Sequence, residues 1–422
     1  MVVSKTGLFN VRKGEGPLVV AGLSLFFLLF VGYFMLRPVR ETMGVAGGVE
    51  NLQWLFTGTF VLTLIALPLF GWLATNVQRR RILPWTYGFL ASNLLVFAAL
   101  FAHLPDNLWS ARAFYIWLSM FNLLSISLAW SVLADVLSSE QAKRLFGLLA
   151  GGASVGGLVG PLLGTLLVAV IGHSGLVVLA TACLLGCIIA AAYLHQYRDR
   201  HPLPADTQLP RSRPLGGNPF AGASEVLRSP YLLAIALFVV LLASVSTFLY
   251  FEQARLVAEQ FTSRTEQTQV FGLIDSAVQF LSILTQVFVT GHLARKLGVG
   301  ILLVAVPLLM VVGFLWLAMA PLFAVFVVVM VVRRVGEYAL VRPGREMLYT
   351  VVAPEHKYKA KNFTDTVVYR GGDALSGWVK RGLDLLGEHP GLAMLIGAGI
   401  ALIWALTGGW LGREQRRRDT EQ

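Results

Sequence analysis

Long apolar runs most strongly constrain what this chain can fold into. A helix needs about 20 mostly apolar residues to cross the hydrocarbon core of a bilayer, and twelve segments meet this length, some as amphipathic helices. They are residues 17–38, 53–75, 82–103, 112–137, 145–171, 174–196, 230–256, 268–290, 299–320, 322–349, 360–387 and 390–412. Only 14% of the residues are charged, compared with about 25% in soluble domains. The sequence therefore predicts an all-α membrane protein with twelve transmembrane helices, and it excludes a soluble enzyme.

The twelve segments fall into two sets of six. Residues 197–228 are rich in proline, arginine and glycine and lack helical periodicity, which is typical of a linker. We therefore expect a six-helix bundle over 1–196, a cytoplasmic linker over 197–228, and a six-helix bundle with a basic cytoplasmic tail over 229–422. The halves also repeat one another, because Gly156 and Gly371, which lie 215 residues apart, each begin a Gly-Gly pair.

Basic residues gather in the even-numbered connections between the predicted helices. Arg79 to Arg81 follow the second helix, Arg295 follows the eighth, and Lys357 and Lys359 follow the tenth. Cytoplasmic loops of membrane proteins are enriched in lysine and arginine, so we expect both termini in the cytoplasm and the protein in a bacterial inner membrane. The net charge of +11 therefore needs no nucleic-acid partner to explain it.

Charged side chains also lie inside the tenth and eleventh predicted helices. They include Arg333, Arg334, Glu337, Arg342, Arg345, Glu346, Lys361, Asp365, Arg370, Asp373 and Lys380. Glu337 can reach Arg333 or Arg334 within its own helix. A charge in hydrocarbon costs roughly 2.5–3.5 kcal/mol on insertion scales, so we expect these groups to face each other and a water-filled cavity. Cations predominate, and arginine matches phosphate or carboxylate in a bidentate manner. The pattern predicts a small anionic solute. Pro343 and Gly344 should interrupt the tenth helix beside the cavity.

Two arginines stand near the end of the first predicted helix. Arg37 and Arg40 are three residues apart and share a helix face, and Pro38 between them permits a kink. One interpretation is that they simply end the helix at the membrane interface. The other is that they turn into the cavity and hold an anion.

Isolated carboxylates in other helices have two interpretations. Asp135, at the end of the fourth helix, is expected to form a salt bridge with Lys143 or Arg144, and Asp275 lies within the apolar eighth helix. A lone carboxylate in a membrane helix is a proton carrier or the partner of a distant arginine. A proton-coupled mechanism would use Asp275 or Glu337.

The fifth predicted helix is unusually rich in glycine. Its glycines are Gly147, Gly151, Gly152, Gly156, Gly157, Gly160 and Gly164. Glycine at helical spacing lets two helix backbones approach closely. The stripe predicts tight helix packing, a smooth surface along which the halves move, or both.

No motif for a cofactor, a metal or ATP hydrolysis is present. The sequence has no phosphate-binding loop ending in Gly-Lys-Ser/Thr and no His-Glu-x-x-His motif. Cys183 and Cys187, four residues apart on one apolar helix, are interpreted as small core residues. We therefore expect neither a bound cofactor nor ATP-driven transport.

Several motifs resemble a known family. LRPVRE at 36–41 is similar to the LRPLKD of the ATP/ADP exchange translocases of plastids and intracellular bacteria, and WSVLADVLSSEQAKRLF at 130–146 is similar to their segment ending in EAKRF. RPGREMLYTVVAPEHKYKAKNFTD at 342–365 resembles their PTKEMAYIPLDxExKxKGKAAxD.

The resemblance implies a major-facilitator-like fold and a positively charged central site for nucleotides. By position, Arg40, Arg345, Lys359 and Lys361 take the places of family lysines. Phe363 replaces a small residue of the family motif, so a different organic anion is an open alternative.

We therefore expect a secondary transporter that moves an organic anion by alternating access and acts as a monomer, without a metal. The expected anion-binding residues are Arg37, Arg40, Arg334, Arg342, Arg345, Lys361 and Arg370. The carboxylates expected to neutralise them or carry a proton are Asp135, Asp275, Glu337, Asp365 and Asp373. The alternatives are a transporter of an amphiphilic, lipid-like anion and a non-transporting membrane partner or assembly factor.

Overall fold

The described chain is helical throughout its regular secondary structure. The computed structural model describes residues 11–12, 14–202, 220, 222–386 and 390–421. Most of the predicted linker, residues 203–219 and 221, lies outside this range. Within the described residues there is no strand, which agrees with the predicted all-α class.

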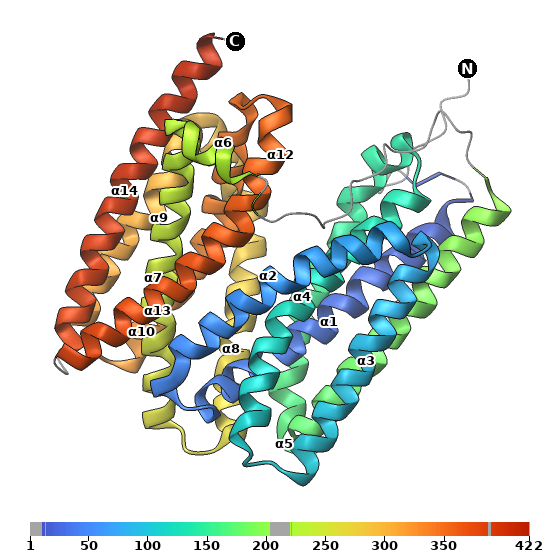
Figure 1. Ribbon diagram of the computed structural model, residues 1–422, viewed down its shortest axis with the longest axis horizontal. Coiled ribbons are helices and arrows are strands. Elements are labelled where there is room, and N and C mark those ends of the chain that lie inside the picture. The colour runs from blue at the N-terminus through green and yellow to red at the C-terminus, as the bar shows by residue number, and fades with distance from the viewer. Residues whose placement is uncertain (1–10, 13, 203–219, 221, 387–389, 422) are drawn as a thin grey trace. The chain divides into compact units, whose positions relative to one another are not determined.

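Five long helices occupy the first part of the chain (Figure 1). They are α1 (Gly16–Ala46), α2 (Leu52–Asn76), α3 (Arg79–His103), α4 (Leu108–Val136) and α5 (Ser139–Arg200). The 62 residues of α5 would extend about 93 Å as one straight helix, about three times the thickness of a hydrocarbon core. Gly172 divides it, because its φ of 67° lies in the left-handed region that glycine tolerates. This break falls between the predicted helices 145–171 and 174–196.

The second part contains more and shorter helices. They are α6 (Ala223–Arg228), α7 (Pro230–Gln260), α8 (Arg264–Thr285), α9 (Gly291–Met319), α10 (Phe323–Gly336), α11 (Arg342–Leu348), α12 (Pro354–Phe363), α13 (Tyr369–Leu386) and α14 (Pro390–Glu421). Three π-helical turns join some of them, at Gln286–Thr290, Glu337–Val341 and Thr364–Val368. The short helix α6 lies where the sequence predicted a linker without helix. Glu225 in its first turn and Arg228 in its last complement the helix dipole, and Val226 is buried.

Eight helical stretches of the described chain are long and apolar enough to cross a membrane. Two of them, Ser139–Arg200 and Arg264–Met319, have 62 and 56 residues, and each contains a glycine with positive φ, Gly172 or Gly298. The charged helices from α10 to α13 are not among the eight. The protein is thus a multi-pass membrane protein, and the count of twelve spans remains a prediction.

Contacts divide the chain into two units. Unit 1 comprises Met1–Met43, Ala66–Gly217 and Ser263–Ser276, and unit 2 comprises Gly44–Ile65, Asn218–Thr262 and Ala277–Gln422. Helix α2 therefore begins in unit 2 and ends in unit 1, whereas α8 begins in unit 1 and ends in unit 2. The predicted division of the chain at the linker does not anticipate that these two helices begin in one unit and end in the other.

The glycine stripe of α5 packs directly on the backbone of α1 in unit 1. A Cβ atom on Gly152, Gly156 or Gly160 would lie only 2.8, 2.6 or 2.8 Å from the main-chain oxygen of Leu23, Phe27 or Val31. Both series advance by four residues, so the two helices remain in close contact over several turns. This geometry confirms the prediction of tight helix packing.

Adding one methyl group to this stripe should destabilise the protein. We expect Gly156→Ala to cost about 1–3 kcal/mol, because the new carbon would collide with backbone that cannot rotate away. Gly147→Ala, where a Cβ would meet nothing within 4 Å, should be neutral or stabilise by about 0.5–1 kcal/mol. Thermal unfolding of both variants in detergent tests the difference. Equal midpoints would argue against tight packing at Gly156.

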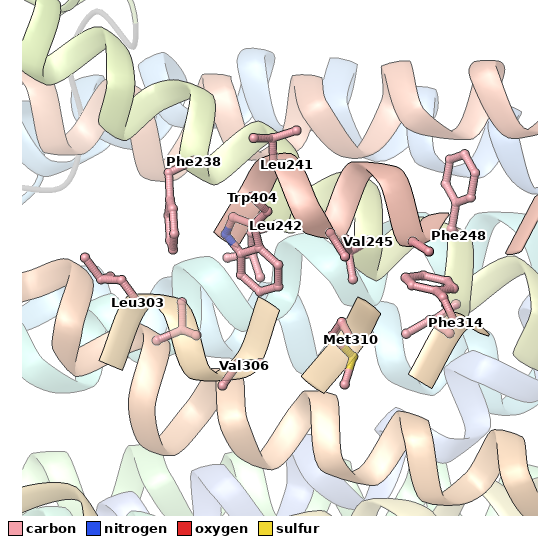
Figure 2. Close-up of a cluster of buried hydrophobic side chains, with 14 of the residues drawn as sticks. Phe238, Leu241, Leu242, Val245, Phe248, Leu303, Val306, Met310, Phe314 and Trp404 are labelled. Atoms are coloured by element: carbon pink, nitrogen blue, oxygen red, sulfur yellow. The ribbon is translucent and has the colours of Figure 1, made fainter. Parts of the chain in front are cut away.

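In unit 2 the apolar core lies between α7, α9 and α14. These helices run side by side (Figure 1), and Figure 2 shows Phe238 and Leu242 of α7, Val306 and Phe314 of α9, and Trp404 of α14 in one cluster. All five side chains are at most 1% exposed.

Near the start of unit 1, the carboxylate of Glu15 accepts hydrogen bonds from three residues. Arg144 Nη2 donates to its Oε1 at 2.7 Å, Gln141 Nε2 donates at 3.1 Å, and the main-chain N–H of Arg12 donates to Oε2 at 2.9 Å. Burial raises the pKa of the Glu15 carboxyl, but these hydrogen bonds and the charge of Arg144 outweigh it and lower the pKa to about 2.

The stability of the protein should therefore fall in acid. A folded-state pKa below the unfolded value of about 4.5 means that the contribution of Glu15 is fully present above pH 4.5 and is lost as the pH falls toward 2. We expect that contribution to be about 1–2 kcal/mol after solvent screening. Glu15→Gln should flatten this part of the pH profile of the unfolding midpoint, and an unchanged profile would contradict the assignment.

Candidate functional site

A π-helical turn opens the charged region of unit 2. The predicted interruption of the helix at 322–349 is the turn Glu337–Val341, which lies just before Pro343. Because Pro343 has no N–H, a carbonyl of the preceding turn loses its main-chain donor. Gln286 Nε2 donates to the carbonyl of Tyr338 at 3.1 Å, and Thr290 Oγ1 donates to that of Ala339 at 2.7 Å. Side chains from the turn after α8 thus donate hydrogen bonds to two carbonyl groups of this π-turn, in which Pro343 leaves a carbonyl without its main-chain donor. Turns of this kind are frequent at functional sites.

Glu337 is enclosed by cationic and polar side chains. Its Oε2 accepts from Arg333 Nη1 at 2.9 Å, and its Oε1 lies 3.7 Å from Arg342 Nη2. Arg333 also donates to Ser246 Oγ of α7 at 2.8 Å. The side chains of Arg333 and Glu337 are each only 7% exposed, whereas that of Arg342 is 58% exposed and lies over the Tyr338 ring at 4.5 Å. The predicted pairing of Glu337 within its helix is confirmed.

A second carboxylate lies on α13. Asp373 is buried, accepts from Thr247 Oγ1 of α7 at 3.3 Å, and lies 3.6 Å from Arg370 Nη1. Nearby, Ser244 of α7 and Ser376 of α13 form a hydrogen bond of 2.8 Å. The helix α7 therefore presents a polar edge to α13 within a mostly apolar sequence.

The third group joins α11 to the segment from α12 to the next π-turn. Arg345 Nη2 lies 3.1 Å from Asp365 Oδ1, and Lys361 Nζ donates to Glu346 Oε2 at 2.6 Å. These pairs are more open than Arg333–Glu337, since Asp365 is 29%, Lys361 32% and Glu346 52% exposed, while Arg345 is 13% exposed. Asp365 belongs to the π-turn Thr364–Val368.

Unit 2 therefore concentrates charge in a short stretch. Its cationic members are Arg333, Arg334, Arg342, Arg345, Lys361 and Arg370, and its acidic members are Glu337, Glu346, Asp365 and Asp373. We call these ten residues the charged cluster. Six cations and four carboxylates leave a formal excess of two positive charges. The cluster can thus attract an anion and can also neutralise most of its own charge through internal pairs.

Unit 1 holds a smaller charged group around α1. Arg37 Nε lies 3.6 Å from Asp275 Oδ2 of α8, and both side chains are largely buried. Arg40 Nη2 donates to Glu41 at 2.5 Å, and its guanidinium lies 5.1 Å from the Tyr115 ring. Since α1 continues to Ala46, the interpretation that these arginines end the helix is wrong.

Asp135 was expected to pair with Lys143 or Arg144. The structure places Arg144 on Glu15, with hydrogen bonds of 2.7 and 3.2 Å. The role of Asp135 therefore stays a prediction.

Sequence reasoning missed the polar side chains that accompany these charges. Ser246 and Thr247 contact Arg333 and Asp373, and Gln286 and Thr290 satisfy the opened backbone. A signal existed, because small polar residues inside the apolar run of α7 would have marked its inward edge. Their individual partners were not visible in the sequence.

Comparisons with known proteins agree with this architecture. The sequence matches the family model for the Major Facilitator Superfamily over residues 22–359. It is 24% identical to ADP,ATP carrier protein 1 of Chlamydia muridarum, covering 94% of this chain and 88% of the relative, and 21% identical to ADP,ATP carrier protein 2 of Chlamydia pneumoniae, covering 97% and 91%. These similarities confirm the family resemblance inferred from the three motifs.

Solved structures share the fold. The structure of the nucleoside transporter NupG aligns with a TM-score of 0.65 at 14% identity, covering 93% of this chain and 98% of that one. A POT family transporter in complex with a thioalcohol-conjugated peptide aligns with a TM-score of 0.66 at 13% identity, covering 95% and 96%. At these identities the likeness concerns the fold alone.

Proposed function

Because this chain belongs to the Major Facilitator Superfamily and is a secondary membrane transporter rather than an enzyme, we propose that it moves an organic anion by alternating access. We further propose that the anion bears phosphate, as a nucleotide does. The observation that carries this proposal is the charged cluster of unit 2, with its excess of cations. Groups of this kind cost too much in a membrane helix to be kept for packing alone.

The internal ion pairs suggest how the cluster would accept a solute. A carboxylate that neutralises an arginine in the empty site holds the place that a phosphate takes when it binds. Arg345–Asp365 and Lys361–Glu346 are the more open pairs, so they can exchange partners with less change in solvation. In the pair Arg333–Glu337 each side chain is only 7% exposed. We therefore assign this pair a structural role, which is to hold α10 in place.

The same logic gives each remaining residue a role. Arg342 and Arg370, which are 58% and 33% exposed, would contact the anion. Arg334 is buried, at 5% exposure, and would contribute its positive charge from behind them. In unit 1, Arg37 and Arg40 would contribute positive charge, with Asp275 as the partner of Arg37. In a proton-coupled cycle, Asp275 or Glu337 would take up the proton.

The curated relatives support a nucleotide as the solute. Both are named ADP,ATP carriers, and the motif that contains Arg345, Lys359 and Lys361 resembles the corresponding stretch of that family. We also propose that both termini lie in the cytoplasm, as the distribution of lysine and arginine suggests. The protein would act as a monomer in a bacterial inner membrane.

Transport in liposomes tests the proposal. Vesicles containing the purified full-length protein and loaded with ADP should take up labelled ATP, whereas empty vesicles should take up less if exchange is obligatory. A thermal-shift series with nucleotides, sugar phosphates and organic acids should identify the bound class, since a ligand of the folded state raises its unfolding midpoint. Absence of both uptake and any shift with all of these anions would reject the organic-anion proposal.

Two alternatives have distinct outcomes in the same assays. Competition by lipid, but not by nucleotide, would indicate an amphiphilic anion. Stable co-purification with another membrane complex, without any solute bound or moved, would indicate an assembly factor.

A further inference from the structure

A cavity of about 350 Å³ lies in unit 2, outside the charged cluster. It is bounded by α6, the start of α7, the start of α12 and the end of α14. The lining side chains that matter here are Glu225, Arg228, Ser229, Tyr231, His356 and Arg418. Its volume falls within the range of small-molecule sites, and on the predicted topology it lies at the cytoplasmic membrane surface.

Arg418 is held in place at the edge of this cavity. Its guanidinium lies 4.5 Å from the centre of the Tyr231 ring, and its Nε donates to Glu414 at 2.9 Å. Tyr231 is fixed in turn, because its hydroxyl donates to the carbonyl of Leu348 at 2.9 Å. The Nη atoms of Arg418 have no acceptor among the described residues, so the fixed guanidinium can donate to a ligand.

Two further lining side chains are unengaged. Within the part of the chain that the structure describes, neither Arg228 nor His356 has a side-chain hydrogen bond or ion pair. Together with Arg418 they make the lining rich in hydrogen-bond donors, and its two guanidinium groups suit a phosphate group.

Glu225 adds a carboxylate to the lining of the cavity. Its Oε1 lies 3.7 Å from Lys359 Nζ, whereas its Oε2 is buried and has no hydrogen-bond partner among the described residues. A buried carboxylate oxygen without a donor is costly. Because Glu225 belongs to the lining, a turn of its carboxylate toward the cavity would let a ligand N–H donor remove that cost.

We propose that this cavity binds a phosphate-bearing amine with the chemistry of phosphoethanolamine. The phosphate is held by Arg228 and Arg418, and the ammonium donates to the carboxylate of Glu225. The ligand is either the soluble compound or the head group of a bilayer lipid, since basic pockets between membrane helices are known to bind phosphate-bearing lipid head groups. The site is separate from the solute site proposed above and does not depend on it.

Binding to the full-length protein in detergent tests the proposal. We expect soluble phosphoethanolamine to raise the unfolding midpoint, and phosphocholine, which has no N–H donor, to bind at least about tenfold more weakly, as expected for the loss of about 1.4 kcal/mol. Arg418→Gln and Arg228→Gln should each weaken phosphoethanolamine by about tenfold or more. Glu225→Gln should remove the preference over phosphocholine. Arg413→Gln, an exposed change on α14 outside the lining, should bind as the parent protein does.

A second measurement separates the two sources. In nanodiscs, phosphatidylethanolamine that displaces the soluble compound would support the lipid head group, and failure to displace it would support the soluble ligand. Phosphoethanolamine that does not bind, or that binds no better than inorganic phosphate, would overturn the proposal. So would an unchanged preference in Glu225→Gln, or displacement by ADP at equal affinity. Because these readouts do not measure transport, they are independent of the identity of the transported solute.

Discussion

Replacing Arg345 with alanine should abolish solute uptake and leave the protein folded. Arg345 is one of the two cations in the more open pairs of the charged cluster, and its partner Asp365 is 29% exposed. Loss of one charged partner from a recognition site costs about 2–5 kcal/mol, so we expect uptake to fall by a factor of about 30 to several thousand. The unfolding midpoint should change little, because the alanine leaves space in which water can reach the carboxylate of Asp365, whose side chain is already partly exposed.

Uptake into liposomes by Arg345→Ala, Arg345→Lys and Arg413→Ala makes the comparison specific. Lysine keeps the charge but loses the forked geometry of arginine, so Arg345→Lys should retain part of the activity. Arg413 is exposed on α14, and its replacement should leave uptake unchanged. Full uptake by Arg345→Ala would remove Arg345 from the proposed site.

Arg40→Ala should also stop uptake, but it gives a less direct test. Arg40 pairs with Glu41, whose side chain is only 9% exposed. Its removal leaves a buried carboxylate that has lost this partner, and part of any loss would come from instability. The unfolding midpoint must therefore be measured together with transport for this variant.

Replacing Glu337 with glutamine should destabilise the protein by about 3–5 kcal/mol, which is the usual cost of breaking a buried ion pair from one side. Glu337 and Arg333 are each 7% exposed and lie 2.9 Å apart, so the remaining guanidinium would stay buried without its carboxylate. Thermal unfolding in detergent should show a midpoint several degrees lower.

A double variant shows whether the loss of stability in Glu337→Gln comes from the unpaired charge or from lost packing. Replacing both Arg333 and Glu337 with methionine removes the two buried charges together, and such replacements are often neutral. We expect the double variant to be more stable than Glu337→Gln. If it is less stable, the pair contributes mainly through contacts such as the hydrogen bond from Arg333 to Ser246, and the charge argument is wrong.

Several features of the site were readable from residue spacing. The four-residue step from Arg333 to Glu337 places both on one helix face, and the pair forms as predicted. The repeat was readable too. Gly156 of the first Gly-Gly pair packs on α1. Gly372, the second glycine of the other pair, packs on α7, with its Cβ position 3.2 Å from Ala243. Each half thus uses a glycine of its fifth predicted helix, or of the corresponding eleventh, against its first.

Other features needed the tertiary structure. The π-turn Glu337–Val341 is stable because Gln286 and Thr290, some 50 residues earlier, donate to its carbonyls, and no local pattern shows such donors. The pair Arg345–Asp365 joins residues 20 positions apart across a turn. Helices α2 and α8 each belong partly to both units. The hydrophobic periodicity of the sequence does not show this.

The sequence by itself therefore determined that the protein lies in a bilayer and which of its charged groups need partners there. Its long apolar runs require a bilayer, and its excess of cations within them requires partners, because hydrocarbon solvates neither charge nor open backbone. Only the tertiary structure decided which partner each group received. That choice depends on distances between helices remote in the chain, which arise from side-chain packing rather than from local spacing.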